Sequence, residues 1–298
     1  MNPIRCVEVS KKFRRVQALD RLNLEVPEGA VYALIGANGA GKTTAIKTMM
    51  NILEPDAGLI EIAGKDSRRL RGPDFQTIGY VSENQKLPEW MTVDYLMRYL
   101  KPFYPTWDDT AAATLIRKFG LPGDRKLSQL SRGMKMKAAL ASSLACHPRL
   151  VVLDEPFSGL DPLVRDEFIE GLIESAEGTT ILISSHDLAE IESFASHAGY
   201  LEQGRMRFSE EMSSLSARFR EVEVTLGEPT DLPRNWPAEW LQPQTSPAVI
   251  RFIDTQFDER AITDRVRALF PRMMELNARA MPLREIFVTL AKEERKAA

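Results

Sequence analysis

The sequence GANGAGKT at residues 36–43 decides the fold, because it joins an apolar strand to the start of a helix. Ala30 to Ile35, just before it, form a nearly continuous apolar run, and the residues from Thr43 onward have the pattern of a helix. Glycines in such a loop let backbone N–H groups close around phosphates at a helix N-terminus. A plain glycine-rich turn is the alternative, but the flanking strand and helix favour a phosphate-binding P-loop.

The P-loop pattern gives each position a predicted role. Lys42 is expected to reach the β- and γ-phosphates of ATP, and the Thr43 hydroxyl is expected to ligate Mg²⁺. The other predicted nucleotide contacts come from the loop and the first turn of the helix: Gly36, Asn38, Gly39, Ala40, Gly41 and Thr44. The predicted cofactors are therefore ATP and Mg²⁺.

A second apolar run, LVVLDE at residues 150–155, ends in two carboxylates. Asp154 is predicted to hold Mg²⁺, directly or through water. Glu155 is placed to accept a proton from the water that attacks the γ-phosphate, as a general base. An acidic pair after a strand often only caps a turn, so it is the combination with the P-loop that indicates catalysis.

At this point the chain resembles the ABC ATPase family, over about residues 4–219. The sequence LSRGM at residues 130–134 stands where that family has its LSGGQ signature, ahead of the strand with the carboxylates. The resemblance implies that Ser131 and the N–H of Gly133 face a γ-phosphate, with a helix dipole behind them. Taken alone, the same residues would be an ordinary helix cap.

The resemblance assigns three further residues. Asp161, in SGLD at residues 158–161, is identified as the key position of the D-loop, which crosses between two such subunits. His186 takes the place of the switch histidine, which contacts the γ-phosphate and steadies the catalytic water. Phe13 resembles the aromatic residue that stacks on adenine. A surface histidine and a packed phenylalanine are the alternatives for the last two.

The sequence departs from the family at three positions. Glu83 stands where the family usually has Gln, and an ionised Glu accepts hydrogen bonds but repels phosphate. Contact of Glu83 with Mg²⁺ or its waters is therefore expected, and Gln85 is the alternative for the missing amide. Arg132 and Met134 replace the first Gly and the final Gln of the signature, and they leave its Ser and its second Gly in place.

Hydrophobic patterns outline the rest of the chain. Val7 and Val9, then Leu22 to Val26, alternate with polar residues and predict an antiparallel sheet at the N-terminus. Apolar runs at residues 150–153 and 180–184 are typical of parallel strands buried on both faces, as in a doubly wound sheet. Periodic apolar positions between the two halves of the site predict an inserted helical subdomain at about residues 87–146.

The predicted fold class is therefore α/β: a P-loop NTPase of ABC type with a mixed core sheet, an antiparallel N-terminal sheet and the helical subdomain. Composition shifts near Arg220, where strand-like alternation precedes a proline-rich stretch. We expect an ATPase domain at residues 1–219 and a small α+β domain at 220–298. An apolar stripe from Leu283 to Leu290 predicts a final amphipathic helix, most simply packed on its own domain.

Composition excludes several classes of protein. A net charge of -3 indicates no broad basic face, so no nucleic-acid partner is expected. Cys6 and Cys146 are isolated, so neither a disulfide framework nor a zinc ribbon is predicted, and His147 and His197 have no spaced metal-binding partner. Signal-peptide and membrane-spanning segments are also not expected, because no apolar run approaches roughly 18 residues.

The resemblance implies a transport subunit on the cytoplasmic face of the inner (plasma) membrane, bound peripherally. Its partners would be a second ABC ATPase subunit, identical or related, which completes the ATP site, and a separate transmembrane permease. The form Leu-Ser-x-Gly-Met-Lys looks like a bacterial exporter branch that exports drugs, antibiotics or lipids. Two alternatives stay open: a soluble ABC ATPase acting on ribosomes or nucleic acid, and a nucleotide-gated regulator that hardly hydrolyses ATP.

Overall fold

A computed structural model of the chain describes residues 2–228 and 231–297. In it, the apolar runs before the P-loop and at residues 150–153 and 180–184 form strands of one central sheet. The sheet has six strands in the order β10-β9-β3-β8-β7-β6. They are β3 (Val31–Ile35), β6 (Ile78–Ser82), β7 (Leu150–Asp154), β8 (Thr180–Ser185), β9 (His197–Glu202) and β10 (Arg205–Glu211). All but β10 are joined in parallel pairs, and β7 and β8 are buried throughout, as predicted.

The strand order brings the predicted site together. Strand β8 lies between β3 and β7, although it follows both in the sequence. In register, Ile35 is opposite Ser185, and Asp154 is opposite Ser184 on one side and Ser82 on the other. The P-loop, the two carboxylates and His186 therefore leave the sheet at the same edge, as is usual for ligand sites in parallel sheets.

The alternating N-terminal residues form a second, antiparallel sheet in the order β2-β1-β4-β5. Its strands are β1 (Ile4–Phe13), β2 (Val16–Val26), β4 (Ala57–Ile62) and β5 (Lys65–Asp66). Apolar side chains of this sheet, such as Leu22 and Ile60, share one hydrophobic core with Ile46 of helix α1 (Lys42–Met49) and Val152 of β7. Burial of this shared surface fixes the P-loop between the two sheets.

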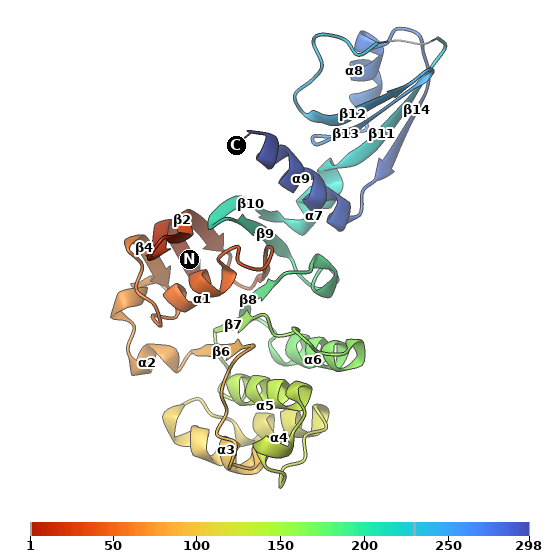
Figure 1. Cartoon of the computed structure of the whole chain (residues 1–298). Helices are drawn as coiled ribbons and strands as arrows, with labels where there is room; N and C mark the ends of the chain where they lie inside the picture. The colour runs from red at the N-terminus through yellow and green to blue at the C-terminus, as the bar shows by residue number, and fades with distance from the viewer. Residues whose placement is uncertain (1, 229–230, 298) are drawn as a thin grey trace. The chain divides into compact units, whose positions relative to one another are not determined.

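The helical subdomain contains α3 (Val93–Leu100), α4 (Asp109–Lys118) and α5 (Arg132–Leu144), which lie together in Figure 1. It is connected to the sheet by the loop after β6 and by β7. Helices α3 and α4 bury the periodic apolar positions named by the sequence, including Leu96, Met97 and Leu115. Side-chain caps begin the helices: Thr92 at α3, Asp108 at α4, and Ser131 at α5. Helix α6 (Pro162–Ser175) follows β7.

Several short elements complete this part of the chain: α2 (Gly72–Phe75) and the 3-10 helices at Ser67–Arg69, Lys101–Phe103, Leu127–Gln129 and Leu188–Glu190. None of the helices among residues 2–228 and 231–297 has the length and hydrophobicity that crossing a bilayer requires.

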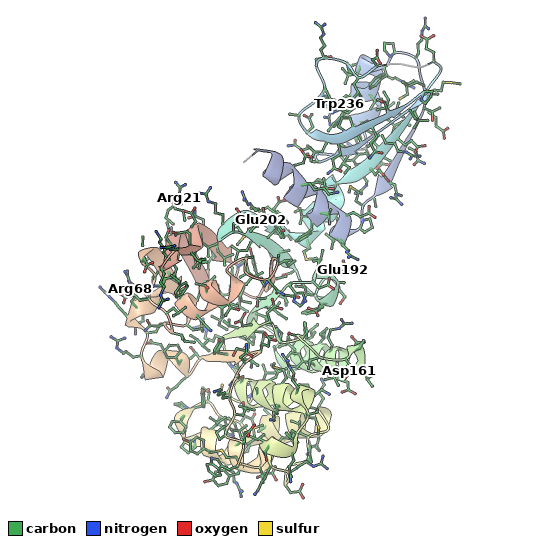
Figure 2. All side chains as sticks on the ribbon, viewed as in Figure 1. Arg21, Arg68, Asp161, Glu192, Glu202 and Trp236 are labelled. Atoms are coloured by element: carbon green, nitrogen blue, oxygen red, sulfur yellow. The ribbon has the colours of Figure 1, made fainter. Side chains whose placement is uncertain are left out.

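The C-terminal unit is a four-stranded antiparallel sheet with helices, as predicted for a small α+β domain. Its strands, in the order β12-β13-β11-β14, are β11 (Arg220–Leu226), β12 (Trp240–Ser246), β13 (Val249–Asp254) and β14 (Met273–Ala280). Helix α8 (Ile262–Leu269) contributes to its core, where Val222 and Val266 pack with aromatic side chains, among them Trp236, which Figure 2 labels.

The chain divides into two compact units between Ser209 and Glu210, whereas the sequence led us to expect a boundary between residues 219 and 220. Helix α7 (Met212–Arg218) belongs to the C-terminal unit, because it contacts the final helix α9 (Leu283–Ala297). Arg218 also donates hydrogen bonds within this unit, to Glu210 and to the carbonyl oxygen of Thr255 at 2.8 Å. In the predicted stripe of α9, Ile286 and Phe287 are buried.

Candidate nucleotide site

Close packing of the backbone explains two of the glycines of the P-loop, Gly36 and Gly41. A Cβ at Gly36 would lie 2.3 Å from the carbonyl oxygen of Leu201, and one at Gly41 would lie 2.5 Å from the carbonyl oxygen of Ala18. Gly41 also has φ of +111°, which other residues rarely adopt. Helix α1 begins at the next residue, Lys42, so its free N–H groups point toward the loop. The local structure is that of an anion-binding helix start.

Asp154, at the end of β7, is held by two hydroxyl groups. Its Oδ1 accepts hydrogen bonds from Ser184 Oγ at 2.8 Å and from Thr43 Oγ1 at 3.1 Å. Burial raises the pKa of the Asp154 carboxyl, and the hydroxyls of Ser184 and Thr43 oppose that rise. A cation near this carboxyl would favour its ionised form.

Mg²⁺ fits this donor set, because it prefers hydroxyl, carboxylate, phosphate and water oxygens. The described residues hold no group of three His, Cys, Asp or Glu side chains that could bind a metal by themselves. A cation here would thus depend on phosphate oxygens to complete its shell, with Thr43 and Asp154 as the protein's share. That dependence matches the metal chemistry of P-loop enzymes.

Glu155 lies between Lys42 and His186. Its Oε1 is 3.0 Å from Nζ of Lys42, and its Oε2 is 2.9 Å from Nδ1 of His186. The side chains of Lys42 and Glu155 are only 5% and 11% exposed. Hydrogen bonding to Glu155 raises the pKa of His186, while burial opposes this. The backbone of Glu155 has φ of +50°, and its N–H donates to Ser184 Oγ at 2.9 Å.

The Lys42 ammonium also contacts two backbone oxygens. Besides Glu155, it contacts the carbonyl oxygens of Gly36 at 2.6 Å and Ala37 at 3.3 Å. Phosphate oxygens can bind Lys42 only by replacing some of these partners. Such a replacement would also release the Glu155 carboxylate toward the phosphate end of the site.

A cavity of about 390 Å³ connects these groups. The predicted residues that line it come from the P-loop, the carboxylate strand and the two loops beside them: Asn38, Gly39, Ala40, Gly41, Lys42, Thr43, Thr44, Glu83, Glu155 and His186. Val16, Ala18 and Ser158 also line it and were not singled out by the sequence. Ser158 belongs to the D-loop motif, which was predicted to cross between two subunits and not to line this cavity.

Phe13 is not among the residues that line this cavity; the N-terminal sheet contributes Val16 and Ala18 instead. The Phe13 side chain is 42% exposed, with the Lys11 ammonium 5.6 Å from its ring centroid. Its stacking on adenine stays a prediction.

Three residues predicted to contact ATP across a subunit boundary do not line the cavity of their own chain. Ser131 Oγ accepts from the N–H of Met134 at 3.2 Å and caps α5. Asp161, at the start of α6 in Figure 2, accepts from the N–H of Val164 at 3.0 Å. A Cβ at Gly133 would lie 2.6 Å from Cγ1 of Val164, so this glycine lets α5 approach α6.

Glu83 lines the cavity, but one of its oxygens already has two donors. Oε1 accepts from Ser158 Oγ at 2.7 Å and from Nη2 of Arg132 at 2.8 Å. Ser158 and then Arg132 lower the pKa of Glu83, so it is held as a carboxylate. Gln85 does not line the cavity, and its Oε1 instead accepts from the N–H of Ser82 at 3.4 Å. Magnesium binding by Glu83 stays a prediction.

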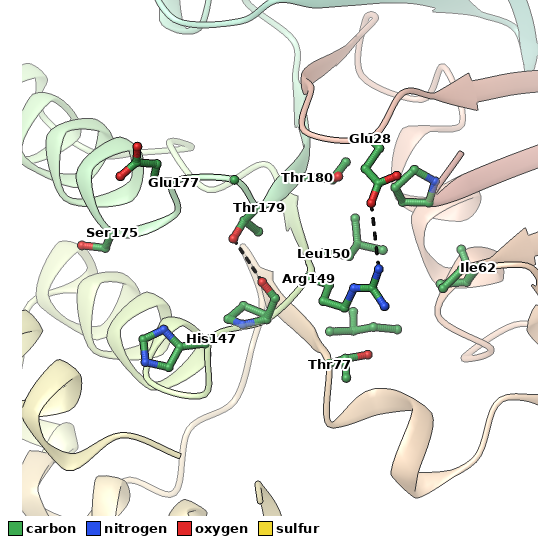
Figure 3. A pocket seen from close by; sticks show the side chains of 15 residues that line it. Glu28, Ile62, Thr77, His147, Arg149, Leu150, Ser175, Glu177, Thr179 and Thr180 are labelled. Carbon is green, nitrogen blue, oxygen red and sulfur yellow. Dashed lines mark hydrogen bonds and ion pairs between the residues drawn. The ribbon is translucent and has the colours of Figure 1, made fainter. Parts of the chain in front are cut away.

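A second cavity of about 510 Å³ lies at the opposite edge of the central sheet, where β6, β7 and β8 begin (Figure 3). Arg149 and Glu28 face each other there at 3.9 Å, and Thr179 donates to the carbonyl oxygen of Pro148. None of the predicted site residues lines it. The chemistry indicated by the sequence is therefore concentrated at the carboxyl edge.

Comparisons with known proteins agree with this geometry. Residues 19–158 match the family described as ABC transporter. The lantibiotic transport ATP-binding protein SrtF of Streptococcus pyogenes is 36% identical, over 68% of this chain and 88% of the relative. A solved ATP-binding subunit of an ABC transporter is 28% identical with a TM-score of 0.65, covering 72% of this chain and 92% of that one. A dimeric bacterial ABC transporter cassette, 23% identical, shares the fold with a TM-score of 0.64 over 70% of this chain and 98% of its own.

Proposed function

Because the chain belongs to the family of ABC transporter ATP-binding proteins and is an ATPase, we propose that it powers a separate membrane permease that exports a drug, an antibiotic or a lipid. The observation that carries the proposal is the buried Lys42–Glu155 pair, with the more exposed His186 bonded to Glu155, beside the Thr43–Asp154 pair. The lantibiotic-transport relative supports export of an antibiotic-like cargo. The protein would act peripherally at the cytoplasmic face of the plasma membrane.

Hydrolysis would use these side chains in fixed roles. Lys42 moves from Glu155 to the β- and γ-phosphates, which frees the carboxylate to accept a proton from the attacking water. His186 holds Oε2 of Glu155 and thereby orients it. Mg²⁺, held by Thr43 and Asp154, would neutralise charge on the phosphates.

A second copy of the chain would complete each ATP site. Ser131 and Gly133 lie outside the cavity of their own chain but at the start of a 13-residue helix, where N–H groups are free for an anion. Because one chain carries both the P-loop and this helix start, two copies facing each other supply two complete sites. Closure on ATP and separation after hydrolysis would give the transporter its two states.

The membrane partner would dock on an exposed aromatic surface of the helical subdomain. We define this surface by Trp90, Tyr95, Tyr99 and Phe103, each at least 42% exposed. Tyr95, Tyr99 and Phe103 are spaced by four residues along α3 and the turn after it, so they share one side. Ring contacts join Trp90 to Tyr95 and Tyr99 to Phe103. Exposed aromatic side chains of this kind are typical interface anchors.

Reconstitution tests the proposed function. The tagged chain is purified together with its membrane subunit, and ATP hydrolysis is measured in proteoliposomes. We expect the permease to stimulate hydrolysis, and Tyr95→Ala with Tyr99→Ala to abolish stimulation while the isolated chain still binds MgATP. Leu163→Ala, at an exposed apolar position on α6, is the matched control and should keep the stimulation. Stimulation by ribosomes or nucleic acid, and not by a permease, would contradict the proposal.

A further inference from the structure

The two main departures from the family pattern meet in space. Arg132 and Glu83 are 49 residues apart in the sequence, yet Nη2 of Arg132 donates to Oε1 of Glu83 at 2.8 Å. Gly159, with φ of +69°, makes room for the guanidinium: a Cβ there would lie 3.3 Å from Nη1 of Arg132. Ser158 donates to the same Glu83 oxygen. The end of β6, the start of α5 and the loop after β7 are thus joined at one carboxylate.

Glu83 lies at the phosphate end of the nucleotide cavity. Its backbone N–H donates to the carbonyl oxygen of Asp154 at 2.9 Å, and Asp154 in turn contacts Thr43. The β- and γ-phosphates of ATP are expected at this end, beside Lys42 and Thr43. A carboxylate with no counter-charge at this position would repel the triphosphate.

We propose that Arg132 is the counter-charge that allows a glutamate to stand at position 83 beside bound ATP. Arg132 is then a positioning residue for nucleotide binding in its own chain, acting through Glu83. The substitution of Gln by Glu and the substitution of a signature glycine by Arg compensate each other. Neither is expected to be tolerated well without the other.

The competing explanation is an ordinary surface ion pair. Exposed pairs typically contribute little, and the Arg132 side chain is 49% exposed. A surface pair, however, would affect only stability, whereas a counter-charge affects affinity for a polyanion. The two explanations therefore differ in which measurement changes.

The test measures binding of the slowly hydrolysed analogue ATPγS, with Mg²⁺, to the full-length chain. Arg132→Ala is expected to weaken binding by about tenfold, since an unpaired carboxylate acts on the terminal phosphates. Glu83→Gln combined with Arg132→Ala should recover most of that loss. The loss should be smaller for ADP, which lacks the γ-phosphate, and should shrink as salt concentration rises.

Lys135→Ala is the matched control. Lys135 lies one turn further along α5 and pairs with Glu89 at 3.2 Å, and neither residue lines the cavity. Arg132→Lys keeps the charge and should keep most of the affinity even if Arg132→Ala proves less stable. Equal affinities of the Arg132→Ala and Lys135→Ala variants, or an unrestored affinity in the double variant, would overturn the proposal.

Discussion

Replacing Glu155 by Gln removes the negative charge and keeps the shape of the side chain. The substitution therefore tests two roles of Glu155: its ion pair with Lys42 and its role as the general base. Oε1 of Glu155 is 3.0 Å from Nζ of Lys42. With an effective dielectric constant of about 20, two unit charges at this distance attract by about 5 kcal/mol. The cost of desolvating this buried pair offsets most of this attraction. A net attraction on the order of 1–2 kcal/mol remains, and it opposes the binding of phosphate to Lys42. Glu155→Gln should therefore bind MgATP about tenfold more tightly.

The same substitution should nearly abolish turnover. A positioned general base contributes on the order of 10²–10⁴-fold to the rate, and a glutamine cannot accept the proton. We expect kcat for ATP hydrolysis to fall by about 10²-fold or more. Tighter binding and slower turnover together distinguish removal of a base from simple damage to the site, which would weaken binding.

Phosphate release at saturating MgATP gives kcat, and equilibrium titration gives the affinity. Glu192→Gln also removes one negative charge, at an exposed position outside the cavity (Figure 2), and should behave as the parent does. A kcat of Glu155→Gln equal to that of the parent would refute the assignment of Glu155 as the base. Unchanged affinity would refute the competition between Glu155 and phosphate for Lys42.

Two further substitutions probe the neighbours of the carboxylates. Ser184→Ala removes the hydroxyl that donates to Asp154 Oδ1 and accepts from the N–H of Glu155. It should lower the free energy of unfolding, measured in urea, by about 1–3 kcal/mol. It should also lower kcat. Unchanged stability would show that water replaces the hydroxyl. For His186, an NMR titration should give a pKa above its ordinary value of about 6.5, and Glu155→Gln should bring it down. The contact between His186 and Glu155 contributes its full stability below pH 6.5, and this contribution is lost as the pH rises through the raised pKa of His186. The destabilisation caused by His186→Asn should therefore shrink toward alkaline pH. A destabilisation that grows with pH would contradict this.

Local sequence was sufficient for the elements and for most of the phosphate site. The P-loop is contiguous, and Asp154 and Glu155 directly follow a buried strand, so their positions depend only on local geometry. The fold class, the helical subdomain and the antiparallel N-terminal sheet were confirmed for the same reason: each has a distinct hydrophobic period.

Residues missed by the sequence depend on strand order and side-chain direction. Ser184 contacts Asp154 because β8 lies between β3 and β7, and the order of strands in a sheet cannot be deduced from the strands themselves. Val16 lines the cavity while Phe13 does not, although the two are paired in the β1–β2 register. Register shifts interrupt this pairing along β1, and each one re-aims the side chains that follow.

The pairing of Arg132 with Glu83 could not be predicted from the sequence, in which the two departures from the family pattern lie far apart. Their contact requires that α5, β6 and the loop after β7 meet, and none of these elements is adjacent in the chain. The division of the chain between Ser209 and Glu210, ahead of the expected boundary, also depends on contacts between distant residues. The packing of α7 on α9 involves residues at opposite ends of the C-terminal unit.

Sedimentation of the Glu155→Gln chain, with and without MgATP, tests most directly the claim that ATP is held between two copies. We predict that the mass doubles with MgATP, and that Lys42→Ala in the same background prevents the change. A mass that stays that of one chain at saturating MgATP, with binding confirmed by titration, would contradict the claim.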